Sequence, residues 1–258
     1  MLNWAQISEP SILLFALILL RMSAFIFSSA VFGQTNIPHH VKILLALVIS
    51  VVLFSTVKNS APLAQFSEDL ILVVVREVAV GLCLGFLTRL FFMTVGMVGD
   101  LVSMSMGLSN AQLFNPISNS QSNALEQYHN ILGILVLLGM NGHHMFLEAI
   151  AQSYQVIPVG YLSLNLASFA EVAHIVQTIL LLTLKMAAPV VVAMLVTNVG
   201  MAILGRAVPQ INVLVTSVPV QVLLGLIVLI VCMPLWILEM NGVLDATTTK
   251  LFEVMKAL

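Results

Sequence analysis

Long apolar runs with ionisable residues inside them constrain this chain most. One run spans residues 70–106 and contains Arg76, Glu77, Arg89 and Asp100. Hydrophobic residues make up 60% of the 258 residues and charged residues only 8%, with a mean hydropathy of +1.10, whereas a soluble domain is about 25% charged. This composition argues against a soluble globular domain and against a disordered chain. It predicts an all-α protein of the membrane.

The remaining bulk properties exclude several other classes. The net charge of −2 gives no clustered basic surface for nucleic acid. Cys83 and Cys232 lie far apart in apolar runs, which favours two small core side chains over a disulfide or a redox pair. No Lys or Arg precedes the first apolar run, and Arg21 lies inside it, so we expect a retained helix rather than a signal peptide.

Turn-forming residues divide the chain into apolar segments that fit membrane helices. At ~20 residues per span the length allows roughly six or more of them. We treat the whole of residues 1–258 as one helical domain, in which an amphipathic tail over 239–258 follows the last apolar run. The expected segments are 11–32, 42–58, 70–106, 125–150 with an interruption at 141–144, 169–204 and 213–238.

Small residues and prolines recur inside these runs. Gly81 and Gly85 are four positions apart, and small residues at that spacing let helix backbones approach closely. Prolines inside a helical pattern predict kinks or ends. We therefore assign helix packing and kinks to Gly81, Gly85, Gly99, Gly107, Pro189, Pro209 and Pro219.

The ionisable residues inside apolar runs are costly in lipid. A charge at the bilayer centre costs about 2.5–3.5 kcal/mol on insertion scales. Arg76 and Glu77 are adjacent and point apart on a helix, so each needs a partner from another segment or another chain. Snorkelling near a helix end is the alternative, above all for Arg89. We expect neighbouring polypeptide to shelter Arg21, Arg76, Glu77, Arg89, Asp100, Lys185 and Arg206.

The chain offers no recognisable catalytic or metal centre. It contains no GxSxG, HExxH, P-loop or GxGxxG motif. His144 and Glu148 are four positions apart beside His143, but a structural metal site normally needs four ligands, and a hydrogen-bonded hairpin corner is the favoured interpretation. We predict no enzyme activity, no metal and no cofactor.

Residues 109–123 differ sharply from the rest. The stretch SNAQLFNPISNSQSN is rich in Asn, Ser and Gln, and such an irregular segment needs protein or water around it. Composition alone favours a plain surface loop.

Three segments together resemble the FliR family of flagellar export-gate proteins, whose virulence counterpart is called SctT. The first is GLSNAQLFNP at 107–116, and the second is NGHH at 141–144 with Ser153, Pro158 and Gly160 downstream. The third lies in the C-terminal half, where order and spacing match at Ala188, Pro189, Gly200, Arg206, Pro209, Gln210, Asn212, Pro219 and Gly225.

The resemblance implies an architecture and a set of partners. One FliR-like subunit joins several FliP-like and FliQ-like subunits in a spiral of kinked helical hairpins around a secretion pore. A FlhB-like subunit wraps the pore entrance. The assembly lies in the bacterial inner membrane at the flagellar basal body, in contact with membrane lipid, with part of the chain above the membrane plane. Its cargo is unfolded exported protein.

The resemblance also gives residues 109–123 a role. In the family the corresponding loop is a plug that projects into the pore and helps to seal it. Here apolar side chains would exclude water, while Asn and Ser satisfy irregular backbone in a wet lumen. The implied plug residues are Asn110, Leu113, Phe114, Asn115, Pro116, Ile117, Ser118 and Asn119.

Two alternatives to a flagellar gate subunit remain at this point. The first is the homologous subunit of a virulence type III secretion system, which the sequence barely separates from the flagellar form. The second is a self-contained secondary transporter, which predicts two halves with matching broken helices. The sequence shows no such repeat.

Overall fold

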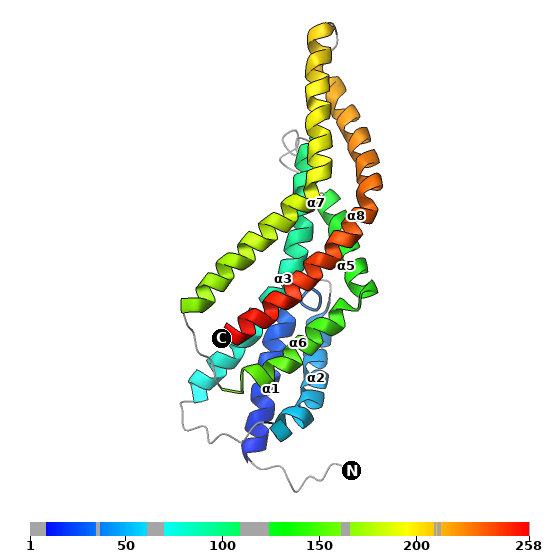
Figure 1. The fold of residues 1–258 in the computed structure, drawn as a ribbon. Helices are drawn as coiled ribbons and strands as arrows, with labels where there is room; N and C mark the ends of the chain where they lie inside the picture. Colours follow the sequence, from blue (N-terminus) through cyan, green and yellow to red (C-terminus); the bar gives the residue numbers. More distant parts are fainter. Residues whose placement is uncertain are drawn as a thin grey trace. The chain divides into compact units, whose positions relative to one another are not determined.

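The computed structural model of the protein describes residues 9–34, 37–60, 70–108, 124–160, 166–208, 210 and 213–257 as helices with short turns at their ends. These residues form helices and no strand, which confirms the predicted all-α fold (Figure 1). The polar stretch 109–123 and Pro209 lie outside the described residues. The helices are α1 (Glu9–Ser28), α2 (His39–Ser60), α3 (Leu70–Ser105), α5 (Ala124–Gly139), α6 (Gly142–Val156), α7 (Leu166–Ala207) and α8 (Val213–Ala257).

Five of these helices are long and apolar enough to cross a membrane, and α5 with α6 makes a sixth if the pair is one broken span. Their outward faces carry large apolar side chains. On α2, for example, Leu44, Val48 and Val52 are all more than half exposed, at 63%, 51% and 63%. Apolar surface on this scale is unstable in water and calls for lipid or other subunits around it.

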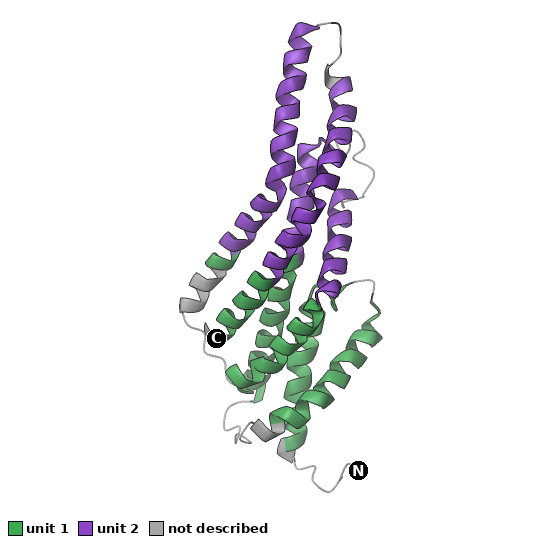
Figure 2. Cartoon of the chain, turned by 45° about the vertical axis from the view of Figure 1, so that its right-hand side comes forward, with its two compact units in different colours: residues 1–91, 141–175, 245–258 green, residues 92–140, 176–244 purple. Residues whose placement is uncertain are grey.

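The chain divides into two compact units, each drawn from separate stretches of sequence (Figure 2). Unit 1 comprises residues 1–91, 141–175 and 245–258, and unit 2 comprises residues 92–140 and 176–244. Helices α3, α7 and α8 therefore contribute to both units. The expectation of a single export-gate domain stays a prediction.

In unit 1, α1 packs against α2 and, very closely, against α3. Phe15 and Phe54 join α1 to α2 edge to face, with ring centroids 5.8 Å apart. A Cβ on Gly81 would lie 2.8 Å from the Ala24 Cβ, and one on Gly85 would lie 2.7 Å from the Phe25 carbonyl oxygen. Only glycine permits this approach at these two positions.

In unit 2, the second half of α3 meets the first turn of α5 just as closely. A Cβ on Gly99 would lie 2.7 Å from the Glu126 Cα. Trp236 of α8 is buried and donates a 2.9 Å hydrogen bond from Nε1 to the carbonyl oxygen of Met186 on α7. Pro189 lies inside α7 and Pro219 inside α8, and each helix continues past its proline.

The C-terminal stretch continues the last long helix. Residues 239–257, where an amphipathic tail is expected, are the last part of α8. No cluster of turn-forming residues separates them from the apolar run before them, and Gly242 alone does not end the helix. The expected apolar stripe is present, because Leu244, Leu251 and Met255 are all buried.

Candidate functional site

A buried ion pair joins α1 to α3 in the interior of unit 1. Nε of Arg21 lies 2.7 Å from Oε2 of Glu77, and Nη2 of Arg21 lies 2.9 Å from Oε1. The two side chains are 0% and 1% exposed. Two parallel hydrogen bonds between a guanidinium and a carboxylate form the strongest common ion-pair geometry.

The Nη1 atom of Arg21 also has hydrogen-bond acceptors within unit 1. Nη1 of Arg21 donates to the hydroxyl of Ser153 at 3.3 Å and to the carbonyl oxygen of Ile157 at 3.1 Å. The guanidinium carbon of Arg21 lies 4.3 Å from the ring centroid of Tyr154, which places the cation over an aromatic face. A buried pair is tolerated only when its remaining hydrogen-bonding groups are satisfied in this way.

Gly160 connects the turn after α6 to two adjacent residues of α3. Its N–H donates to Oε1 of Glu77 at 2.8 Å, and its carbonyl oxygen accepts a 3.1 Å hydrogen bond from Nη1 of Arg76. Its φ of 87° is a left-handed conformation that glycine adopts without strain. Arg76 and Glu77 thus each find a hydrogen-bond partner in another segment, and both bond to the backbone of Gly160.

The other predicted charges lie elsewhere and are less covered. Lys185 of α7 pairs with Glu239 of α8, with Nζ 2.9 Å from Oε1, but its side chain is 65% exposed. Arg89 and Arg206 are exposed, and Asp100 is half-buried. This chain therefore does not bury Lys185, Arg89 or Arg206, because each lies on an outward face of its helix.

The structure describes both flanks of the polar stretch 109–123 in unit 2. Helix α3 ends at Ser105, Gly107 follows with a φ of 74°, and the N–H of Leu108 donates to the carbonyl oxygen of Ser103 at 3.1 Å. This is a glycine cap that ends a helix sharply. Helix α5 then begins at Ala124, with Glu126 in its first turn, where a carboxylate is favoured by the helix dipole.

Comparison with known proteins decides the family. The model of the family described as "Bacterial export proteins, family 1" matches residues 12–247, which is most of the chain. The chain belongs to the FliR family of bacterial export proteins.

Curated relatives agree along nearly the whole length. The flagellar biosynthetic protein FliR of Bacillus subtilis (strain 168) is 31% identical over 236 residues, which cover 90% of this chain and 91% of that protein. FliR of Buchnera aphidicola subsp. Baizongia pistaciae is 30% identical, with 84% of each chain covered. FliR of Escherichia coli (strain K12) is 27% identical, with 84% of this chain and 83% of that protein covered.

A buried histidine of this FliR-family chain escaped the sequence reasoning. His129 of α5 is fully buried, with its ring centroid 4.4 Å from that of Trp236 on α8. Its Nδ1 lies 2.7 Å from the carbonyl oxygen of Leu125, and Nε2 has no hydrogen-bond partner among the described residues. A single histidine in an apolar helix carries no sequence signal of this contact.

The described residues do not bring together a metal-binding group. No cluster of three or more His, Cys, Asp or Glu side chains occurs in the ranges that the structure describes. The rings of His143 and His144 lie 4.1 Å apart at the start of α6, beside Asn141, which has a left-handed φ of 57°. The corner between α5 and α6 is therefore a tight turn.

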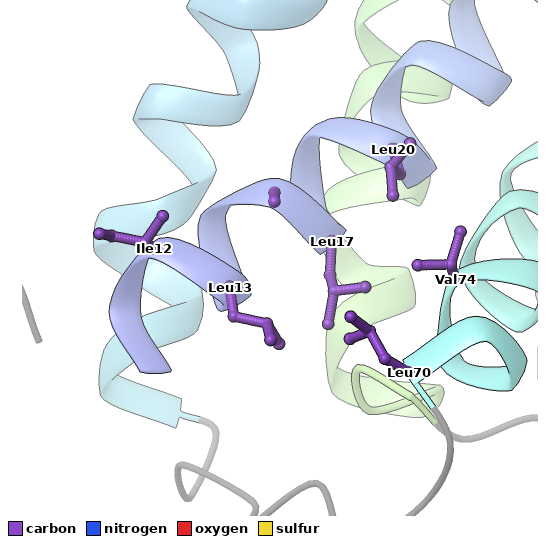
Figure 3. A pocket seen from close by; sticks show the side chains of 7 residues that line it. Ile12, Leu13, Leu17, Leu20, Leu70 and Val74 are labelled. Atoms are coloured by element: carbon purple, nitrogen blue, oxygen red, sulfur yellow. The ribbon is translucent and has the colours of Figure 1, made fainter. Parts of the chain in front are cut away.

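An apolar pocket of about 400 Å³ lies between α1 and α3 in unit 1 (Figure 3). Its lining contains no titratable or nucleophilic side chain, so it offers no group for catalysis. Its apolar lining suits only apolar groups. The lining residues are Ile12, Leu13, Ala16, Leu17, Leu20, Leu70 and Val74.

Proposed function

We propose that this chain is a non-enzymatic subunit of the bacterial flagellar type III export gate. It forms part of the pore through which unfolded flagellar proteins cross the inner membrane. The observation that carries this proposal is the family match over residues 12–247, together with relatives named as flagellar biosynthetic proteins along nine-tenths of the chain. The fold supplies what such a subunit needs, namely several long apolar helices.

The partners in this proposal are FliP-like and FliQ-like subunits, with a FlhB-like subunit at the pore entrance. The exposed charges of the chain support a multi-subunit setting. Lys185, Arg89 and Arg206 are exposed on helices that otherwise carry apolar side chains, and a charge facing lipid is costly. Subunits on these faces would remove that cost. The proposed location is the inner membrane at the flagellar basal body, with part of the chain above the membrane plane.

Residues 109–123 are the proposed plug of this pore. An export gate must pass an extended polypeptide and yet hold back ions. Leu113, Phe114 and Ile117 would exclude water in the closed state, and the Asn and Ser residues would satisfy the backbone in a wet lumen. A polar segment that carries a few apolar side chains and connects two helices suits a part that moves between two positions.

Deletion of the gene, followed by complementation, tests the function. The deletion strain should stop secreting flagellar hook and filament proteins, and the wild-type gene should restore secretion. Export of a protein that uses the general secretory pathway is the control and should not change. Continued flagellar secretion without this chain would contradict the proposal.

Shortening of residues 109–123 tests the plug separately. The assembled complex with the shortened segment should conduct ions in a planar bilayer, whereas the wild-type complex should stay closed. Equal conductance of the two complexes, with equal complex mass, would remove the plug role and leave the subunit role standing.

A further inference from the structure

Each flank of the segment 109–123 packs closely against a glycine of another helix in unit 2. On the α3 side, Met106 is fully buried against α8, where a Cβ on Gly225 would lie 2.7 Å from its Cγ and 2.8 Å from its Sδ. On the α5 side, a Cβ on Gly99 would lie 3.0 Å from the carbonyl oxygen of Leu125. The missing side chains of these glycines make room for the two flanks.

Met106 directly follows α3, which ends at Ser105. Gly107 comes next and has a left-handed φ of 74°. Met104, two positions earlier, is 65% exposed, so burial is not a general property of methionines at this helix end. The buried side chain of Met106 therefore packs this end of α3 against α8 at Gly225.

We propose that Met106 and Gly225, together with Gly99 at the other flank, are positioning residues that fix where the segment 109–123 leaves and re-enters the helices. This inference deepens the proposed function and rests on it wherever ion leakage is the readout. Methionine suits this position, because its flexible side chain fills the space beside Gly225 closely and can return to it after displacement.

A distance measurement tests the positioning without any assumption about export. Spin labels are placed at Leu108 and Ala124 in the full chain, with Cys83 and Cys232 replaced by Ala. The wild-type background should give one narrow distance distribution. Gly225→Val should shift or broaden it by overpacking, and Met106→Ala should broaden it by leaving space.

The chain offers a matched control for each variant. Gly242, also on α8, has no heavy atom within 4 Å of the position of an added Cβ, so Gly242→Val controls for Gly225→Val. Met104→Ala controls for Met106→Ala, because Met104 is exposed. A distribution in Met106→Ala and Gly225→Val equal to that of the controls would overturn the inference.

A double variant that exchanges the sizes of the two side chains gives a second test. A general loss of stability would not produce the recovery that this test expects. The methyl group added by Gly225→Ala fits the space that Met106→Ala leaves, so the double variant should return toward the wild-type distribution. Single and double variants that broaden the distribution additively would overturn the specific contact.

Conductance of the assembled complex tests whether the packing of Met106 against Gly225 affects the plug. Gly225→Val and Met106→Ala should raise ion leakage severalfold at unchanged complex mass, while the two controls stay closed. If the shortened-segment complex leaks ions and neither Met106→Ala nor Gly225→Val does, the inference is overturned and the plug proposal stands. If the shortened segment causes no leakage, the plug proposal fails and the distance measurement still decides the inference.

Discussion

The carboxylate of Glu77 accepts a 2.8 Å hydrogen bond from the backbone N–H of Gly160 while it also holds Arg21 by two further contacts. Three segments far apart in the sequence, α1, α3 and the turn after α6, thus meet at one buried side chain. A buried ion pair contributes little net stability against an apolar replacement, but loss of one partner is expensive. The Glu77 site is therefore sensitive to single substitutions.

We expect Arg21→Ala to destabilise the chain by about 3–5 kcal/mol, because it leaves the carboxylate of Glu77 buried without its cation. Thermal unfolding of the detergent-solubilised chain measures this loss. The double variant Arg21→Met with Glu77→Leu should recover part of it, since no uncompensated charge remains. Its recovery should be incomplete, because the N–H of Gly160 loses its acceptor at a cost of about 1–3 kcal/mol. Full stability in Arg21→Ala would contradict the prediction.

Gly81→Ala should destabilise the crossing of α1 and α3 by about 1–3 kcal/mol through overpacking. The added methyl would meet the backbone of Arg21 and the Cβ of Ala24. Gly200→Ala on α7 is the control, since no heavy atom lies within 4 Å of its added Cβ. The control should be neutral or gain up to about 1 kcal/mol from helix propensity. Equal unfolding temperatures for the two variants would count against the close crossing.

Trp236→Phe should cost about 0.5–1.5 kcal/mol, because it removes the hydrogen bond from Nε1 to the carbonyl oxygen of Met186. The Trp236 side chain is buried in unit 2, so its fluorescence in the native chain should be shielded from an aqueous quencher. Thermal unfolding and iodide quenching measure the two expectations. A tryptophan signal from position 236 that iodide quenches freely would show that this contact is open.

Lys185→Met should change the stability of the isolated chain by no more than about 1 kcal/mol, because exposed ion pairs contribute little. The Lys185 side chain is 65% exposed although it pairs with Glu239. Within the proposed gate the same substitution should weaken assembly, because a neighbouring subunit is proposed to cover this face. Co-purification of the FliP-like and FliQ-like subunits measures the effect, and wild-type yields of the complex would argue against an interface at Lys185.

The sequence predicts the helices and the need of the charged residues for partners. It does not predict which residues pair or which helix faces lie outward, and both have physical causes. Adjacency shows that Arg76 and Glu77 each need a partner from another segment or chain, since neighbouring positions on a helix face apart. The partner Arg21 lies 56 positions away from Glu77, and only the docking of α1 on α3 decides that pairing. Periodicity likewise does not show which side of α7 faces outward, so the exposure of Lys185 is visible only in the structure.

Other features have weaker signals in the sequence. Gly81 and Gly85 are found by their spacing, whereas Gly225 is a single glycine whose importance depends on Met106 from another helix. The contact between His129 and Trp236 joins residues of α5 and α8 in the same way. The break between α7 and α8 is predicted correctly, because Pro209 and Asn212 interrupt the apolar pattern there.

The mass of the native complex in mild detergent decides whether this chain is a gate subunit. We predict a hetero-oligomer that contains one copy of this chain together with FliP-like and FliQ-like subunits. Native mass spectrometry of the tagged chain, expressed from its own locus, gives this composition. A stable monomer or homodimer that carries none of these subunits would contradict the account.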